Sequence, residues 1–259
     1  MILARWRRYR EARVLRRRAI PDALWQLTLA RYPFLARRSA ADRVELHRLA
    51  TLFLAGKEFH GAQGFVVDDD VAVAIAAQAC LPVLRLGLDW YDGFVGIVVH
   101  SDEVVARREV MDDDGIVHEY DEALTGEAMH GGPVMLSWHD VAEAGVSASS
   151  GYNVVIHEFA HVIDLRDGVA DGMPALPSRA AREHWALLLE SHYKRFCRRV
   201  EVGRATVLDP YGAEGIDEFF AVAVESFFVA PQAMRAEHAS LYELFKGFFE
   251  QDPAEEQGP

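Results

Sequence analysis

The sequence contains one short pattern that can do metal chemistry, His157-Glu158-Phe159-Ala160-His161. On a helix, residues four apart lie on the same face, so both imidazoles can direct a nitrogen at a single ion. Zinc binds such nitrogens, and a catalytic zinc site keeps one position open for water. Glu158 follows the first histidine, where its carboxylate can act on that water as a general base. The pattern therefore predicts one Zn²⁺ ion per chain, bound by His157 and His161.

The residues around this pattern predict the helix that it requires. No Pro or Gly interrupts the segment from Tyr152 to Asp167, Ser149 and Ser150 are candidate N-caps, and Gly168 is a candidate stop. The competing interpretation is a buried helix with two hydrogen-bonded histidines and an exposed glutamate. Burying two imidazoles in an otherwise apolar helix would be costly without a partner, which favours the metal site.

Two carboxylates compete for the position of third ligand. Asp167 stands at the spacing of the metzincin pattern, which continues H-E-x-x-H with x-x-G-x-x-H or D. However, Asp164 occupies the position where that pattern has glycine for a sharp turn. Glu218 belongs instead to a second helix, IDEFFAVAVESFF, that is apolar nearly all round, so its carboxylate needs a charge partner. Such a residue would complete a site of two histidines and one glutamate.

Asp164 and Glu225 are candidates for an outer shell that supports the ligands. Asp164 shares a helical face with both histidines and can accept the second N–H of a ligand imidazole. The alternative for Asp164 is a helix-terminal carboxylate that faces solvent. Glu225 lies seven residues after Glu218, two turns along the same face. The alternative for either glutamate is an interfacial residue paired with arginine.

Helical spacing of apolar residues recurs on both sides of these motifs. It predicts two or three short helices between Pro21 and about Phe59, an Ala-rich helix at Val71–Cys80, and a final helix with an apolar stripe from Leu241 to Phe249. Residues 1–20 are rich in arginine and form either a basic helix or a partly disordered segment.

Strand-like runs occur only in the middle of the chain. The segments 93–100 and 133–138 are rich in β-branched or apolar residues and predict two strands, with a turn at 112–115 between them. We therefore expect an α+β fold: one domain over residues 21–251 with a small mixed sheet, an active-site helix and flanking helices at both ends. Residues 252–259 are expected to be a disordered tail.

Charge, cysteine content and the lack of long apolar segments indicate the cellular compartment to expect. The net charge is −13, yet residues 1–48 carry a local charge of +9, which suggests a basic N-terminal surface or merely a solvated helical face. Cys80 and Cys197 form no disulfide framework or metal-type pair, so we expect reduced thiols. The N-terminus lacks the apolar region of a secretory signal, and no apolar stretch is long enough to span a membrane. We therefore expect a cytoplasmic protein without a membrane partner.

Several motifs, taken in order, resemble the Mlc titration factor A family, a group of zinc-dependent peptidases with a zincin-like fold. The similarity spans most of residues 50–250. It rests on Tyr152–Asp164 (YNVVIHEFAHVID), Tyr211–Phe228 (YGAEGIDEFFAVAVESFF) and Gly126–Val141 (GEAMHGGPVMLSWHDV), and more loosely on Ile75–Pro82 and the strand after Trp90-Tyr91.

The resemblance implies a set of site residues. His157, His161 and Glu218 would be the zinc ligands, with Glu158 as the base. Tyr211, seven residues before Glu218, matches the tyrosine that family members place at the active site, where a phenol can donate to the oxyanion of the tetrahedral intermediate. Glu225 remains a candidate for an outer-shell carboxylate that supports a ligand.

One local departure from the family pattern occurs before the third ligand. Members have an acidic or proline-containing approach there, whereas this chain has Gly215-Ile216-Asp217. The resemblance therefore does not imply a geometry for this loop.

The resemblance also implies an activity and a partner. Members cleave small peptides with aminopeptidase-type activity and are associated with Mlc, a repressor of sugar-uptake genes. We expect a peptide substrate, bound as an added strand beside Pro133–Trp138, and consider a repressor partner. A different hypothesis is a binding module that sequesters a repressor, with a structural or vestigial zinc site; Glu158, which ligates nothing, argues against it. Direct nucleic-acid binding through residues 1–20 is disfavoured by the net charge of −13 and the lack of a reading motif.

Overall fold

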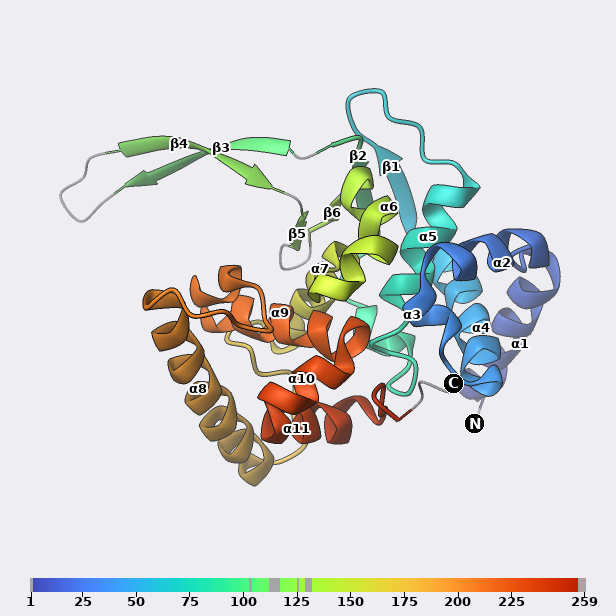
Figure 1. Ribbon diagram of the computed structural model, residues 1–259. Helices are drawn as coiled ribbons and strands as arrows, with labels where there is room; N and C mark the ends of the chain where they lie inside the picture. The colour runs from blue at the N-terminus through green and yellow to red at the C-terminus, as the bar shows by residue number, and fades with distance from the viewer. Residues whose placement is uncertain (1, 103, 112–116, 125, 129–131, 256–259) are drawn as a thin grey trace.

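Helices make up most of the chain, with a small sheet and a separate pair of strands beside them (Figure 1). The computed structural model describes residues 2–102, 104–111, 117–124, 126–128 and 132–255. The α-helices are α1 (Ile2–Arg17), α2 (Asp22–Arg31), α3 (Pro33–Ala36), α4 (Ala40–Gly56), α5 (Asp69–Ala79), α6 (Trp138–Ser147), α7 (Val154–Asp164), α8 (Arg179–Glu201), α9 (Ile216–Val229), α10 (Pro231–Glu237) and α11 (Ala239–Phe249). The short 3-10 helices are η1 (Leu88–Tyr91), η2 (Ala148–Ser150), η3 (Leu165–Asp167) and η4 (Pro210–Ala213). This content agrees with the predicted α+β class.

The main sheet is mixed, with the strand order β1-β2-β6-β5. Its strands are β1 (Glu58–Gly61), β2 (Gly96–His100), β6 (Val134–Ser137) and β5 (Gly126–Ala128). The first three run parallel, whereas β5 is antiparallel to β6. β6 is therefore an inner strand, paired on both sides, and the expectation that a substrate adds beside Pro133–Trp138 is wrong. β5 is the outer strand on that side of the sheet.

A second strand pair lies outside this sheet. β3 (Val104–Met111) and β4 (Val117–Leu124) pair antiparallel over their full lengths, from Val104 opposite Leu124 to Met111 opposite Val117. In Figure 1 this hairpin extends away from the helices. The sequence did not predict it, and the turn expected at 112–115 lies outside the described residues.

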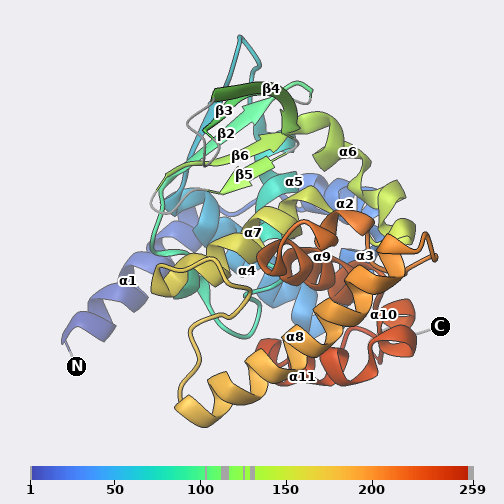
Figure 2. The same ribbon diagram turned by 90° about the vertical axis from the view of Figure 1, so that its left-hand side faces the viewer.

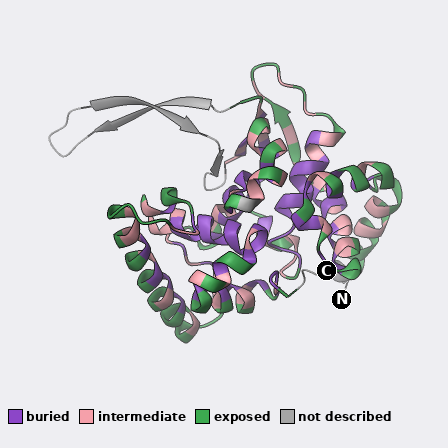
Figure 3. Ribbon diagram, viewed as in Figure 1, coloured by how far each residue is buried: buried purple, intermediate pink, exposed green. Residues whose placement is uncertain are grey.

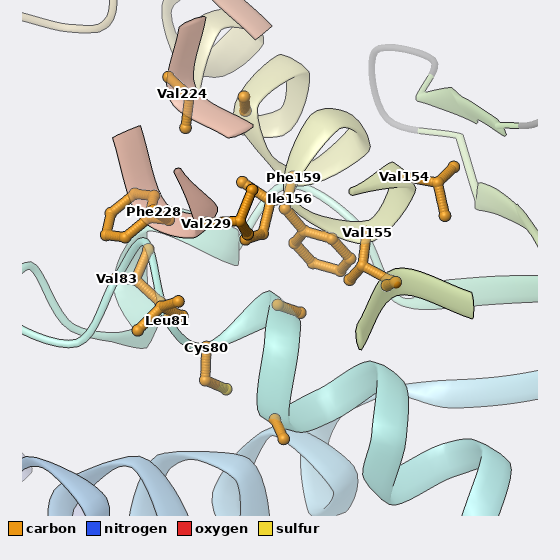
Figure 4. Close-up of a cluster of buried hydrophobic side chains, with 14 of the residues drawn as sticks. Cys80, Leu81, Val83, Val154, Val155, Ile156, Phe159, Val224, Phe228 and Val229 are labelled. Carbon is orange, nitrogen blue, oxygen red and sulfur yellow. The ribbon is translucent and has the colours of Figure 1, made fainter. Parts of the chain in front are cut away.

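Helix α7, which carries His157 and His161, lies in the centre of the molecule, between α5, α9 and the strand β6 (Figures 1 and 2). Much of α7 and α9 is buried (Figure 3). Phe159 of α7 packs against Tyr91 and Phe94, with ring centroids 4.9 Å and 5.8 Å away. Figure 4 shows Phe159 within an apolar cluster formed with α5 and α9. Because Phe159 is about 200° around the helix from His157, this packing turns both histidines away from the apolar cluster.

Both ends of α7 are fixed by local signals. Asn153, and not Ser149 or Ser150, is the N-cap, and its Oδ1 accepts a hydrogen bond from Ile156 N–H at 2.9 Å. The two serines belong instead to η2. After Asp164 the helix tightens into η3, which ends at its C-cap Gly168. The positive φ of 95° at Gly168 is the left-handed conformation that glycine adopts freely.

The chain ends are more ordered than expected in the described part. Residues 2–17 form the helix α1. The prediction of a disordered tail from residue 252 is wrong for 252–255, because Tyr242 Oη donates to Asp252 at 2.7 Å and accepts from Ala254 N–H at 2.9 Å. Residues 256–259 lie outside the described residues. Cys80 is buried, Cys197 is half-buried, and both are free thiols. None of the described helices has the length and apolarity needed to cross a membrane.

Candidate metal centre

Three donor atoms from two helices converge on one point. Nε2 of His157 lies 3.2 Å from Nε2 of His161 and 3.1 Å from Oε2 of Glu218, which is 3.4 Å from Nε2 of His161. A proton can bridge only one pair of these atoms at a time, whereas a cation between them attracts all three. The donor set, two imidazoles and one carboxylate, suits a divalent transition-metal ion. The residues therefore fit a metal, and the structure brings together the three ligands that the resemblance implied.

Glu218 reaches the histidines from the first turn of α9. Gly215 is the N-cap of this helix, and every residue from Phe219 to Val229 is buried against the rest of the chain. Burial raises the pKa of Glu218, but hydrogen bonds with His157 and His161 outweigh it and hold the pKa well below its usual range. The carboxylate is therefore ionised, as a metal ligand must be.

Glu225 supports His157 from behind. Its Oε1 lies 2.7 Å from Nδ1 of His157, and its Oε2 accepts a hydrogen bond from Asn153 N–H. Burial raises the pKa of Glu225, while the hydrogen bond with His157 lowers it. In a neutral imidazole whose Nδ1–H donates to this carboxylate, the lone pair lies on Nε2, the atom that faces Glu218 and His161. Glu225 thus contacts His157 on the side of the ring opposite Nε2, and its role as outer-shell support stays a prediction.

Glu158 follows His157 on α7 and is not one of the three converging donors. It is only 3% exposed, and its Oε2 has no hydrogen-bond partner within the described residues. Burial raises its pKa to about 7, against the opposing effect of the charges on His157 and His161. A carboxyl group with this pKa can take up and release a proton near neutral pH, as a general base and acid must.

Tyr211 lies beside the histidines on η4. Its ring centroid is 6.0 Å from that of His157, and the residue is 44% exposed. The Asp209 carboxylate accepts a hydrogen bond from Tyr211 N–H at 2.9 Å, which fixes the start of this turn. The next residue, Gly212, packs so closely on α9 that an added Cβ would lie 3.3 Å from the Cα of Phe219. The tyrosine is therefore mounted on the helix that carries Glu218, with its side chain accessible to solvent.

Asp164 does not bind an imidazole, contrary to the sequence prediction. One of its oxygens accepts a hydrogen bond from Gly172 N–H at 2.9 Å, and the other has no hydrogen-bond partner within the described residues. The reason is that the loop after η3 folds back over the end of α7 and buries Asp164 completely. Gly172 packs in turn against the first residue of α9, since an added Cβ would lie 2.8 Å from Ile216 O. Asp164 therefore holds a loop against α9, two residues before Glu218.

Asp167, the alternative third ligand, lies away from the metal position. It is exposed on η3, and its carboxylate accepts a hydrogen bond from Val169 N–H at 3.3 Å. The chain does not make the sharp turn after His161 that a metzincin site needs, because α7 continues to Asp164.

Two residues that contact this site were missed from the sequence. Asn153 donates its backbone N–H to Glu225, and its side-chain Nδ2 donates to Oε1 of Gln78 at 2.8 Å. The signal was present in both cases. Asn is a preferred N-cap residue, and Gln78 is the single strongly polar residue in the apolar run VAVAIAAQAC.

Known families and proteins are similar to this chain over most of its length. The sequence model of the glucose-regulated metallo-peptidase M90 family matches residues 4–250. An uncharacterized protein of Synechocystis sp. is 35% identical over 250 residues, which cover 96% of this chain and 90% of that protein. Mlc titration factor A of Enterobacter sp. is 36% identical over 238 residues, covering 90% of this chain and 88% of that protein. Mlc titration factor A of Escherichia coli is 36% identical over 232 residues, covering 88% and 86%. These matches confirm the resemblance inferred from the motifs, and the chain belongs to the glucose-regulated metallo-peptidase M90 family.

Proposed function

We propose that this chain is a zincin-like, zinc-dependent peptidase of the aminopeptidase type that acts on small peptides. The observation that supports zinc is the spacing of the three donor atoms. In a tetrahedral site with bonds of about 2.0–2.2 Å, ligand atoms lie roughly 3.3 Å from one another. The distances between His157, His161 and Glu218 are 3.1, 3.2 and 3.4 Å. Side chains already at this separation need little rearrangement to hold the ion.

The remaining side chains supply proton transfer and orientation. Zinc, when bound, provides Lewis acidity that polarises the scissile carbonyl and lowers the pKa of water. Glu158 accepts a proton from the attacking water and then delivers it to the departing amine. Glu225 keeps the His157 imidazole in the tautomer that leaves Nε2 free. Tyr211 donates its phenol hydrogen to the negative oxygen that develops on the substrate.

The sheet offers a place for the peptide backbone. β5 is the outer strand of the main sheet and packs beside α7, the helix that carries the two histidines. An extended peptide that pairs with β5 would form main-chain hydrogen bonds without requiring a particular side chain. This proposal replaces the edge first expected at Pro133–Trp138.

The test combines metal analysis with hydrolysis by wild type and Glu158→Gln. We expect about one zinc per chain in both proteins, because the three ligands are unchanged. Hydrolysis should fall at least about 100-fold in the variant, since the general base is lost. Absence of zinc together with activity that chelators do not affect would contradict the site. Unchanged turnover by Glu158→Gln would contradict the mechanism.

The aminopeptidase assignment derives from the family resemblance and needs a separate test. Wild type should cleave a short peptide with a free N-terminus and leave its N-acetylated counterpart nearly intact. Equal cleavage of the two would make the enzyme an endopeptidase, with the same metal chemistry.

A second role is suggested by the relatives named Mlc titration factor A. We propose that the chain also binds a transcription repressor of the Mlc type. If binding and catalysis are separate, Glu158→Gln should retain repressor binding while it loses hydrolysis. Calorimetric titration of a purified Mlc-type repressor with both proteins measures this, and no binding by either would reject the role.

A further inference from the structure

A row of buried polar groups continues behind Glu225 into the apolar core. Glu225 accepts a hydrogen bond from Asn153 N–H, and Asn153 Nδ2 donates to Gln78 Oε1 at 2.8 Å. Gln78 Nε2 donates to Ala74 O at 3.2 Å. Gln78 and Asn153 are 0% exposed and Glu225 is 1% exposed. The row therefore connects α5, the start of α7 and α9, and it ends at the metal ligand His157.

The position of Gln78 makes this arrangement unusual for a core. Every residue of α5 from Val73 to Ala79 is buried, and all except Gln78 are apolar. A buried amide costs free energy unless its donor and acceptor atoms are hydrogen-bonded, and here both are used. A methionine of similar size would fill the same volume without this requirement. The Gln78 amide thus holds the side chain of Asn153, and it also hydrogen-bonds the buried Tyr32.

The contact between the Asn153 side chain and Gln78 fixes the position of the Asn153 backbone N–H. Its Oδ1 accepts from Ile156 N–H as the helix cap, so its Nδ2 must face the other way, toward Gln78. With both ends of the amide fixed, the Asn153 backbone presents its own N–H to Oε2 of Glu225. The other oxygen of Glu225 then meets Nδ1 of His157 at 2.7 Å. Each contact constrains the next one.

We propose that Gln78 and Asn153 are positioning residues for the metal ligand His157, acting through Glu225. Without the Gln78 contact, the Asn153 amide can rotate, and the N–H that holds Glu225 shifts. The carboxylate then leaves the plane of the imidazole, and Nε2 is less well directed at the ion. The inference rests on the metal site of the proposed function. It adds that zinc affinity is set partly from α5, a helix that contributes no ligand.

The test is the zinc affinity of Gln78→Met, measured by competition with a chromophoric chelator. Met retains the length of the side chain but cannot accept from Asn153. We expect affinity to fall about tenfold, at the lower end of the roughly 10–100-fold lost with outer-shell partners, because the effect passes through two residues. The visible spectrum of the cobalt-substituted protein should shift as well, since the coordination of His157 changes.

Gln251→Met is the matched control. Gln251 is also a buried glutamine, 4% exposed, and donates to Leu81 O at 3.0 Å, but it lies outside the row. Gln251 Oε1 has no hydrogen-bond partner within the described residues, so Gln251→Met should cost less stability than Gln78→Met, and thermal unfolding of the metal-free proteins is measured in parallel to separate stability from zinc affinity. Equal zinc affinity in the two variants would reduce Gln78 to a purely structural residue and overturn the proposal.

A second variant protects the test against misfolding of Gln78→Met. Asn153→Ser keeps an N-cap oxygen but is too short to donate to Gln78. It should lose zinc affinity to a similar extent, and the double variant should lose no more than the single ones, because they break the same link. If the losses of zinc affinity add in the double variant, Gln78 and Asn153 do not act through the same contact, and the proposal is contradicted. A wild type that binds no zinc would instead reject the proposed function, so the two failures are distinguishable.

Discussion

At the scale of single residues, three glutamates around two histidines have three different environments. Glu218 meets both imidazoles and has a strongly lowered pKa, whereas Glu158 is buried with one oxygen unpaired and has a pKa of about 7. Glu225 is fully buried but hydrogen-bonded at both oxygens. Environments that separate the pKa values of neighbouring carboxyl groups also separate their chemical roles. The different surroundings of the three residues support the proposed roles of ligand, base and support.

The choice of third ligand gives the first prediction at this scale. Glu218→Ala should weaken zinc binding by more than about 100-fold, since losing a ligand costs more than losing an outer-shell partner. Zinc should then stabilise the variant much less than wild type against thermal unfolding, because metal binding and folding are linked. Asp167→Ala is the control and should bind zinc as wild type does, within about twofold. If Asp167→Ala loses the metal and Glu218→Ala does not, the site is metzincin-like.

Tyr211 gives the second prediction. Tyr211→Phe keeps the ring beside His157 but removes the hydroxyl that would donate to the developing oxyanion. We expect kcat to fall about 10²–10³-fold with little change in KM, as for the loss of one oxyanion donor. Steady-state kinetics and zinc content are the measurements, and the metal content should not change. A KM effect at constant kcat would show that Tyr211 contributes to ground-state binding instead.

At the scale of elements, Asp164 shows how a buried carboxylate affects stability. Burial raises its pKa from 3.8 to about 7, although the hydrogen bond from Gly172 lowers it. The folded state therefore binds this proton more tightly than the unfolded state. The resulting stabilisation is complete below about pH 4 and is lost as pH rises through 7.

Asp164→Asn tests this effect because asparagine can still accept from Gly172 N–H but carries no charge. The free energy of unfolding of the variant, relative to wild type, should increase between pH 5 and pH 9. Only the part of the pKa shift between pH 5 and about 7 lies in this range, which sets an upper bound of about 3 kcal/mol on that increase. Urea unfolding of both proteins with a chelator present excludes the pH dependence of metal binding. Parallel pH profiles would show that the group is not perturbed as described.

The elements differ in how far the sequence could define them. The uninterrupted apolar segment around the two histidines predicted α7, and the β-branched run predicted β2. β1 was missed because EFHG is short and follows directly on a helical pattern. The sequence could not predict that β6 is an inner strand, because its neighbour β5 is only three residues long and has no apolar alternation. Strand order depends on which segments meet in space.

The same limit applies to the site. His157, Glu158 and His161 follow from spacing within one helix, because that geometry is local. The roles of Glu218 and Glu225 depend on how α9 packs against α7, which spacing cannot give. The prediction for Asp164 failed because the loop after η3 folds back and occupies its carboxylate. Gln78 was missed because its partner lies 75 residues further along the chain.

At the scale of the whole molecule, the basic N-terminal helix is set apart from the acidic remainder. α1 packs against α4, and its connection toward the metal centre runs through Arg7, which binds Asp89 of η1 at 2.7 and 2.8 Å. Arg166, just after α7, donates to the backbone oxygen of Asp89 and lies 4.9 Å over the ring of Trp90. The Arg166 contacts do not involve α1. Removing α1 therefore leaves the end of α7 attached to η1.

Deletion of residues 1–17 should accordingly lower thermal stability but leave peptide hydrolysis within about twofold of wild type. The Arg7–Asp89 pair is more than half exposed at both side chains, and exposed ion pairs contribute only about 0–1 kcal/mol. Most of the loss in Tm should come from the packing of α1 on α4, so full-length Arg7→Ala should be nearly as stable as wild type. The truncation keeps Ile20, which is 4% exposed and belongs to the core. Circular dichroism establishes that the shortened protein is folded before kcat/KM is compared. A folded truncation that no longer hydrolyses small peptides would show that α1 is coupled to the metal centre, through Asp89 and the end of α7.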